Sequence, residues 1–261
     1  MVSRLPNAPL TEVVFEMRWE TIEGTVPPFP VDPGFPSLFD AFRSFARKNE
    51  FIREKEMHKK YTGIGNSISQ RFYREDSDFP LYQLGHGIYA ANDSVNYEWE
   101  LFRRFAADGA IEVFKNYPKF KEHRLNIKQL EVRYINIFEE SLTGSSDLVK
   151  FIEEGTQIRL DLPKFWDSQK LKKQRRGRIQ IEADTKLPGT VFFIDLTTAK
   201  REATPVIRLE IKILSRGDKL LAAQNSRSFS KKLTEWMEAA HNLTSPAFKE
   251  LVSENAFEQF K

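Results

Sequence analysis

The residues best suited to chemistry form one basic run, Lys170-Leu171-Lys172-Lys173-Gln174-Arg175-Arg176-Gly177-Arg178. Phosphate binding favours such a cluster, because each contact releases condensed counterions and arginine offers a two-pronged fork to phosphate oxygens. The same run could instead guard an exposed sheet edge, since Lys and Arg hinder unwanted strand pairing. We therefore take its six cations as a candidate nucleic-acid-binding site with a structural alternative: Lys170, Lys172, Lys173, Arg175, Arg176 and Arg178.

The histidines show no metal-binding or catalytic spacing. The chain has His58, His86, His123 and His241, and none belongs to an HxH or HExxH pattern. There is no Cys, which excludes disulfides, thiolate zinc sites and cysteine nucleophiles. Glycine-containing segments at 63–66 and 85–87 lack the GxGxxG and GxxxxGK[ST] forms that cradle phosphates. The sequence predicts no catalytic residue, metal site or cofactor, and an enzyme built from scattered polar residues stays open as an alternative.

The overall composition is that of a globular protein. The chain has 261 residues, of which 40% are hydrophobic and 30% charged, and its 22 Phe predict a core rich in large rings. A net charge of +3 is too small to indicate nucleic-acid binding by itself. No apolar run has the length of a signal peptide or a membrane span, so we expect a cytoplasmic protein without a membrane partner.

Hydrophobic periodicity predicts an α+β fold in which a mostly antiparallel, curved sheet packs on long helices. The first half is predicted as β–α–β–β–α–β. Strands are expected at 13–19, 67–73, 81–91, 130–138, 157–162, 177–184, 190–196 and 206–214. Helices are expected at 36–49 with Ser37 as N-cap, and at 97–117, 147–153, 219–241 and 246–260, while 53–60 could extend the first helix or form a linker.

A polar linker at 142–146 suggests a division of the chain. It would separate an N-terminal α+β half, 1–143, from a strand-rich C-terminal half, 144–261, that ends in a long helix. Each half would hold strands and one major helix, so two similar halves and a single continuous domain both stay open.

Opposite charges alternate on one face of three predicted strands. Such rows favour cross-strand ion pairs on a solvent-facing sheet surface, with a concave face that binds a polar partner as the alternative. The rows are Glu16 with Arg18, Glu131 with Arg133, and Arg208 with Glu210 and Lys212.

Several segments carry a resemblance to a known family. The opening segment is Leu5-Pro6-Asn7-Ala8-Pro9-Leu10-x-Glu12-Val13-Val14-Phe15-Glu16-Met17-Arg18-Trp19. Further segments are Tyr89-x-x-Asn92, the start of the helix at 97–99, Arg133-Tyr134-Ile135-Asn136, Ala240-His241 and the stretch around Phe248. Together they resemble a sporadically distributed family of uncharacterised bacterial proteins of about this length. The resemblance implies no activity. The patchy distribution of that family is similar to that of mobile or defence-associated genes.

These observations give an order of functional hypotheses. The first is a non-enzymatic interaction component of a multi-protein bacterial system, of an antiphage or toxin–antitoxin-like kind, with a protein partner from the same gene cluster. The second is a nucleic-acid-binding component that uses the 170–178 run. The third is an enzyme with an unrecognised site. Self-association into a homo-oligomer is compatible with each of them.

Overall fold

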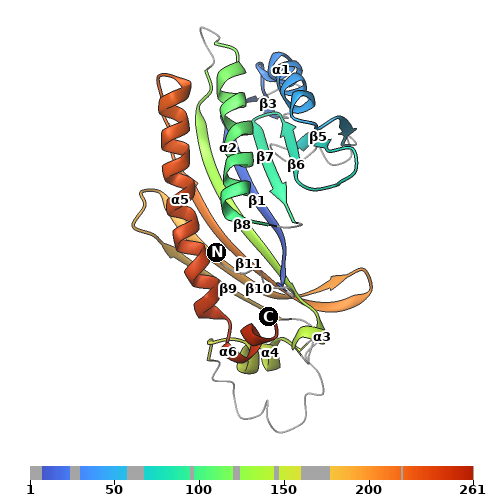
Figure 1. The fold of residues 1–261 in the computed structure, drawn as a ribbon. Helices are drawn as coiled ribbons and strands as arrows, with labels where there is room; N and C mark the ends of the chain where they lie inside the picture. Colours follow the sequence, from blue (N-terminus) through green and yellow to red (C-terminus); the bar gives the residue numbers. More distant parts are fainter. Residues whose placement is uncertain are drawn as a thin grey trace.

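The computed structural model describes residues 8–23, 30–57, 68–94, 97–119, 124–143, 147–159, 177–218 and 220–260. Over these ranges the fold is α+β, and its centre is an open nine-stranded sheet in which every neighbouring pair is antiparallel (Figure 1). The strand order is β4-β5-β6-β7-β1-β8-β11-β10-β9. The expected fold class is therefore confirmed.

The strands are long in the middle of the sheet and short at one edge. Their bounds are β1 (Leu10–Trp19), β4 (Arg53–Glu56), β5 (Ile68–Tyr73), β6 (Leu81–Gly85), β7 (Ile88–Asp93), β8 (Ile127–Phe138), β9 (Arg178–Asp184), β10 (Thr190–Arg201) and β11 (Thr204–Arg216). A separate two-stranded pair consists of β2 (Ile22–Glu23) and β3 (Pro30–Val31).

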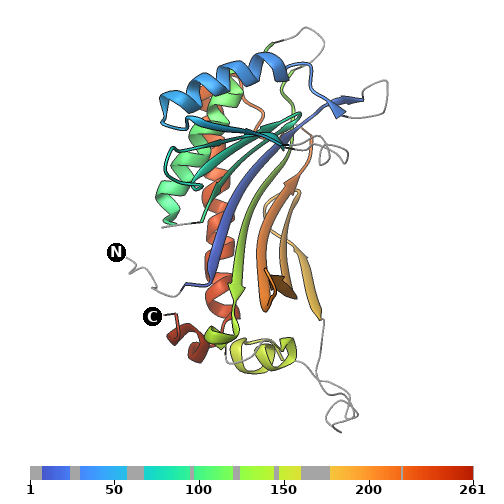
Figure 2. The same ribbon diagram turned by 90° about the vertical axis from the view of Figure 1, so that its right-hand side faces the viewer.

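The helices in the described ranges differ widely in length. They are α1 (Phe35–Lys48), α2 (Trp99–Asn116), α3 (Glu140–Thr143), α4 (Leu148–Gly155), α5 (Ser226–Leu251) and α6 (Glu254–Glu258). The two longest, α2 and α5, lie side by side on one face of the sheet, while α3, α4 and α6 gather at one end (Figures 1 and 2). The expectation of long helices holds for α1, α2 and α5 but not for the other three.

Strict alternation explains how β1 turns its apolar side to the helices. Val13, Phe15, Met17 and Trp19 are at most 1% exposed and belong to the main core. Successive strand residues point to opposite faces, so Glu16 and its even-numbered neighbours lie on the face away from α2 and α5.

Large rings fill the main core, as the Phe content predicted. The ring of Phe42 on α1 lies 5.6 to 5.7 Å from those of Phe72, Tyr82 and Tyr89 on three adjacent strands. These contacts fasten α1 to the β5–β7 part of the sheet.

A second apolar cluster closes the other end of the sheet. It joins Phe138 at the end of β8 to Phe151 of α4, at a ring distance of 4.8 Å, and to Phe260 after α6. The carboxylate of Asp147 caps α4 by accepting the backbone N–H of Val149 at 3.0 Å.

The helix boundaries needed two corrections. Helix α1 begins at Phe35 with Gly34 in the N-cap position, so Ser37 is not its cap. Helix α5 begins after Asn225, whose side chain accepts the N–H of Ser228, and it continues through Pro246 to Leu251. The expected break between 241 and 246 is therefore wrong, because the first helix ends at Leu251 and a separate short helix, α6, follows it. Packing of the stretch after Pro246 on the second cluster outweighs the one helical hydrogen bond that proline cannot donate.

The strand predictions also needed corrections. Residues 53–56 form β4, a charged edge strand, instead of a helix extension or a linker. The 81–91 segment is two strands, because Gly87 takes a positive φ of 70° in the turn between β6 and β7. Residues 157–159 are not in a strand, and the rest of the expected 157–162 strand lies outside the described residues.

The two predicted halves share one sheet. Strand β8 pairs with β1 on one side and with β11 on the other, so that Val132 lies opposite both Phe15 and Ile213. Within the described ranges, no helix is both long enough and apolar enough to cross a membrane.

Candidate functional site

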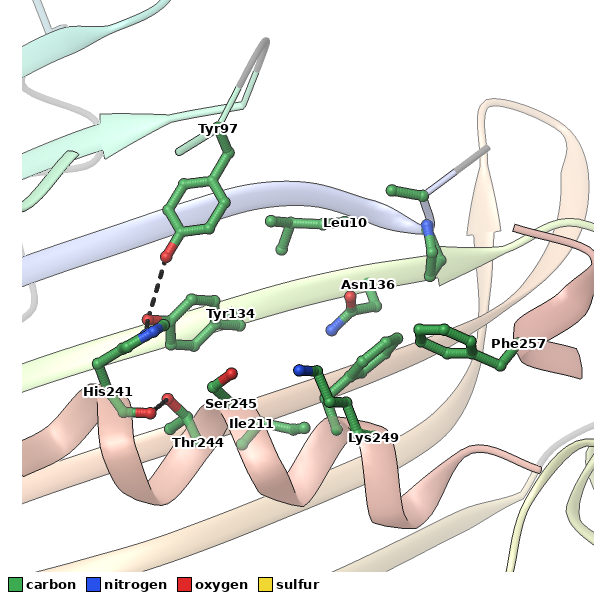
Figure 3. Close-up of a pocket in the computed structure, with 13 residues that line it drawn as sticks. Leu10, Tyr97, Tyr134, Asn136, Ile211, His241, Thr244, Ser245, Lys249 and Phe257 are labelled. Atoms are coloured by element: carbon green, nitrogen blue, oxygen red, sulfur yellow. Dashed lines mark hydrogen bonds between the residues drawn. The ribbon is translucent and has the colours of Figure 1, made fainter. Parts of the chain in front are cut away.

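A pocket of about 350 Å³ opens beside the C-terminal half of α5, above the start of β1, the last part of β8 and the middle of β11 (Figure 3). Apolar side chains form most of its surface, with a few polar groups among them. The described residues that line it are Ala8, Pro9, Leu10, Tyr97, Tyr134, Asn136, Ile211, His241, Thr244, Ser245, Phe248, Lys249 and Phe257.

Local periodicity explains why these side chains face one space. On β8, Tyr134 and Asn136 are two residues apart and point to the helix-covered face, and Ile211 pairs with Tyr134 across the strands. On α5, His241 and Phe248 are seven residues apart, which places them on one side of the helix with residues 244 and 245 between them. One strand pair thus forms the floor and one helix stripe forms a wall.

A chain of hydrogen bonds crosses one end of the pocket. The Tyr97 hydroxyl donates to the Tyr134 hydroxyl at 3.3 Å, and the Tyr134 hydroxyl lies 3.0 Å from Nδ1 of His241 (Figure 3). The imidazole also stacks on the indole of Trp99, with ring centres 4.1 Å apart and planes at 7°. The imidazole of His241 is therefore fixed both at its edge and on its face.

The groups in this chain are uncharged at neutral pH. Burial lowers the pKa of His241 below its ordinary value, against the opposing effect of the Glu238 and Glu100 carboxylates. Burial also raises the pKa of Tyr134 to about 12 and raises that of Tyr97. A neutral imidazole can accept a hydrogen bond on Nδ1, so the Tyr134 hydroxyl can donate to His241. The hydrogen bonds then run in one direction, from Tyr97 through Tyr134 to His241.

Glu238 connects this end of the pocket to α2. Its carboxylate accepts the indole N–H of Trp99 at 3.4 Å and lies 2.8 Å from Nε of Arg103 in an ion pair. The ion pair and the ring stacking both hold α2 against α5. The pocket wall is consequently part of the helix packing and exists before any partner binds.

Of the predicted basic site, only Arg178 lies within the described residues, and it does not line this pocket. Arg178 begins β9, and its guanidinium donates to both carboxylate oxygens of Asp195 on β10, at 2.7 and 2.9 Å. Asp195 is 6% exposed, so the fork of Arg178 already serves a sheet carboxylate. The other five cations of the candidate site, Lys170, Lys172, Lys173, Arg175 and Arg176, lie outside the described residues.

The described histidines lie apart from each other. His86 is in the turn between β6 and β7, where it stacks on Phe35 at 4.3 Å and accepts the backbone N–H of Asp32 at 3.2 Å. His241 is in the pocket, and His58 and His123 lie outside the described residues. Across the described parts of the chain, no group of three or more His, Cys, Asp or Glu could hold a metal ion.

The charged rows on the strands form ion pairs between residues two apart on one strand, and not the cross-strand pairs that the sequence led us to expect. They lie on the sheet face away from α2 and α5, and the carboxylates are nearly buried beneath longer cations. The pairs are Arg18 with Glu16 at 2.5 Å, Arg133 with Glu131 at 3.5 Å, Lys212 with Glu210 at 3.8 Å, and Arg208 with Glu210. Glu16 and Glu131 are direct cross-strand neighbours. Burial, and to a lesser extent the charge of Glu16, raises the pKa of Glu131.

The segments that carry the family resemblance meet at the pocket. Leu10, Tyr97, Tyr134, His241 and Phe248 come from five of the quoted stretches, and each of them lines it. Sequence reasoning missed the site because it ended one helix at 241 and began another at 246. A single helix through this region would have placed His241 and Phe248 on one face.

No family model, curated protein or solved structure matches this chain. The geometry of the pocket therefore carries the functional argument.

Proposed function

We propose that this protein is a non-enzymatic interaction component, and that its pocket receives an apolar segment of a partner protein. The observation that carries the proposal is a preformed, open pocket with apolar walls next to a rigid aromatic cluster. Apolar pockets with a few fixed polar groups are the usual form of a binding site. A volume of about 350 Å³ is at the lower end of the ~300–1,000 Å³ typical of such sites, and suits one or two side chains.

The polar groups of the pocket support binding over catalysis. Among its described lining residues there is no Asp, Glu or Cys that could act as a nucleophile or activate His241. The Nδ1 atom of His241 is engaged by Tyr134, and one ring face is covered by Trp99. The imidazole is held in place as part of the wall.

The biological setting of the proposal comes from the sequence. The family resemblance supports a multi-protein bacterial system of an antiphage or toxin–antitoxin-like kind. The partner would then be encoded in the same gene cluster and meet this protein in the cytoplasm.

A pocket-filling variant tests the proposal. Ser245 lines the pocket on α5, so Ser245→Phe should occupy the space that a partner needs. Asn242 is exposed on the same helix and does not line the pocket, so Asn242→Phe is the matched control. Binding would be measured by fluorescence anisotropy with labelled octapeptides ending in Leu, Phe, Ser or Asp, each as free acid and as amide.

Peptides with apolar ends should bind the wild type and Asn242→Phe but not Ser245→Phe. Circular dichroism would confirm that both variants fold. Affinity that does not depend on the last residue of the peptide, or that is unchanged in Ser245→Phe, would contradict the proposal.

A further inference from the structure

We propose that the pocket recognises the C-terminal carboxylate of its partner polypeptide, with Lys249 as the cation that binds it. This inference rests on the proposed function, because it specifies which apolar segment enters the pocket.

Lys249 places a positive charge at the mouth of the pocket. Its side chain comes from α5 at the pocket mouth, and its ammonium points into the pocket toward Asn136 and Ser245 (Figure 3). Its positive charge also contributes, less than burial does, to the lowered pKa of His241. Within the described residues it has no ion-pair partner, whereas Lys231 on the same helix and Lys212 on β11 each pair with a glutamate. The pocket therefore contains an ammonium group available to an anion.

The side chain of Asn136 is 3% exposed and lines the same pocket. Among the described residues its amide makes one hydrogen bond, a long one of 3.5 Å from Nδ2 to the carbonyl of Leu209. A buried amide can form up to four hydrogen bonds and loses free energy when they are not made. Asn136 thus retains both donor and acceptor capacity inside the pocket.

These two side chains match the end of a polypeptide. A lone ammonium suits the single charge of a carboxylate, whereas phosphate recognition typically uses arginine forks or several cations. The amide of Asn136 can pair with the N–H and C=O of a last peptide group, which a simple aliphatic acid lacks. The rings of Phe248 and Phe257 and the side chain of Ile211 would then contact an apolar final residue.

The test compares head groups on one peptide. The labelled octapeptide ending in Leu or Phe would be titrated as free acid and as C-terminal amide against the wild type, Lys249→Met and Lys231→Met. Methionine keeps the length of the lysine stem without its charge. Lys231 is exposed on α5, pairs with Glu235 and does not line the pocket, so its variant is the control.

The free acid should bind the wild type and Lys231→Met roughly tenfold or more tightly than the amide, as expected for one charge-assisted hydrogen bond. Lys249→Met should bind acid and amide alike, and Asn136→Leu should weaken both. Equal binding of acid and amide by the wild type would overturn the carboxylate assignment while leaving the proposed function intact. If no peptide binds the wild type, either as free acid or as amide, the proposed function itself is overturned.

A final measurement separates a polypeptide end from a free aliphatic acid. Octanoate and 1-octanol would be used as competitors against the bound peptide acid. Weak competition by both supports the peptide assignment. Displacement by octanoate at the concentration of the peptide itself would overturn it, because the last peptide group would then contribute nothing.

Discussion

Replacing Tyr134 with Phe removes the hydroxyl at the centre of the pocket's hydrogen-bond chain and leaves the ring in place. That hydroxyl accepts from Tyr97 at 3.3 Å and lies 3.0 Å from Nδ1 of His241. A typical hydrogen bond contributes about 0.5–1.5 kcal/mol, and two are lost here, so the free energy of unfolding should fall by about 1–3 kcal/mol. The longer of the two bonds favours the lower half of that range. Urea denaturation followed by tryptophan fluorescence would measure the loss.

The same variant should change the titration of His241. Tyr134 donates to the neutral imidazole and so favours it, and removing that bond should raise the pKa of His241 toward its ordinary value. In the wild type this pKa is lowered, so the stabilisation is complete above pH 6.5 and is lost as the pH falls through the lowered value. The stability difference between wild type and variant should therefore be largest above about pH 7 and shrink in acid. Imidazole resonances followed by NMR would report the pKa directly.

Tyr97→Phe is the control for this reasoning. It removes the donor at the far end of the chain but keeps the bond between Tyr134 and His241. We expect a smaller loss of stability and an unchanged pKa for His241. If Tyr134→Phe costs less than about 0.5 kcal/mol and leaves the pKa of His241 unchanged, the hydrogen-bond chain has no energetic role and the reasoning is refuted.

Three further predictions concern helix packing, the partly buried histidines and the ion pair at the start of β9. A methyl group at Gly109 of α2 would overlap the Tyr89 hydroxyl and lie 2.7 Å from Cζ of that ring. Gly109→Ala should therefore lower the free energy of unfolding by about 1–3 kcal/mol, although alanine normally favours a helix. Urea denaturation would measure the loss, and part of it should be relieved in a Tyr89→Phe background. Burial lowers the pKa of both His86 and His241, so stability should fall as the pH drops below 6.5, and His241→Asn should flatten that profile in denaturation series from pH 8 to 5. Arg178→Ala should reduce thermal stability, because a nearly buried carboxylate on β10 loses its bidentate partner. It should leave the salt dependence of any DNA or RNA binding unchanged. A reduced slope of log affinity against log salt concentration in filter-binding titrations would instead show that this arginine contacts phosphate.

Local pattern was sufficient for most of the secondary structure. The alternation of Val13, Phe15, Met17 and Trp19 predicted β1 and the face that it turns to the core, because successive side chains of a strand point to opposite faces of the sheet. The helical spacing of apolar residues predicted α2 in the same way. The absence of Cys likewise excluded thiol chemistry from the sequence alone.

Tertiary packing decided what local pattern could not. Pro246 is a local signal to end a helix, but Phe248 and Leu251 pack on the second core cluster and the helix continues. Arg178 belonged to a basic run that suggested phosphate binding, yet β10 places the carboxylate of Asp195 beside it.

The pocket depends most strongly on the tertiary structure. Tyr134 is 37 residues from Tyr97 and 107 from His241, and the three meet because α5 crosses the sheet above β8. Periodicity predicts the face of an element on which each side chain lies, because that direction depends only on the backbone dihedral angles of the element. Which faces meet depends on how the apolar surfaces of all elements are buried together, and that sum is not a local property of the sequence.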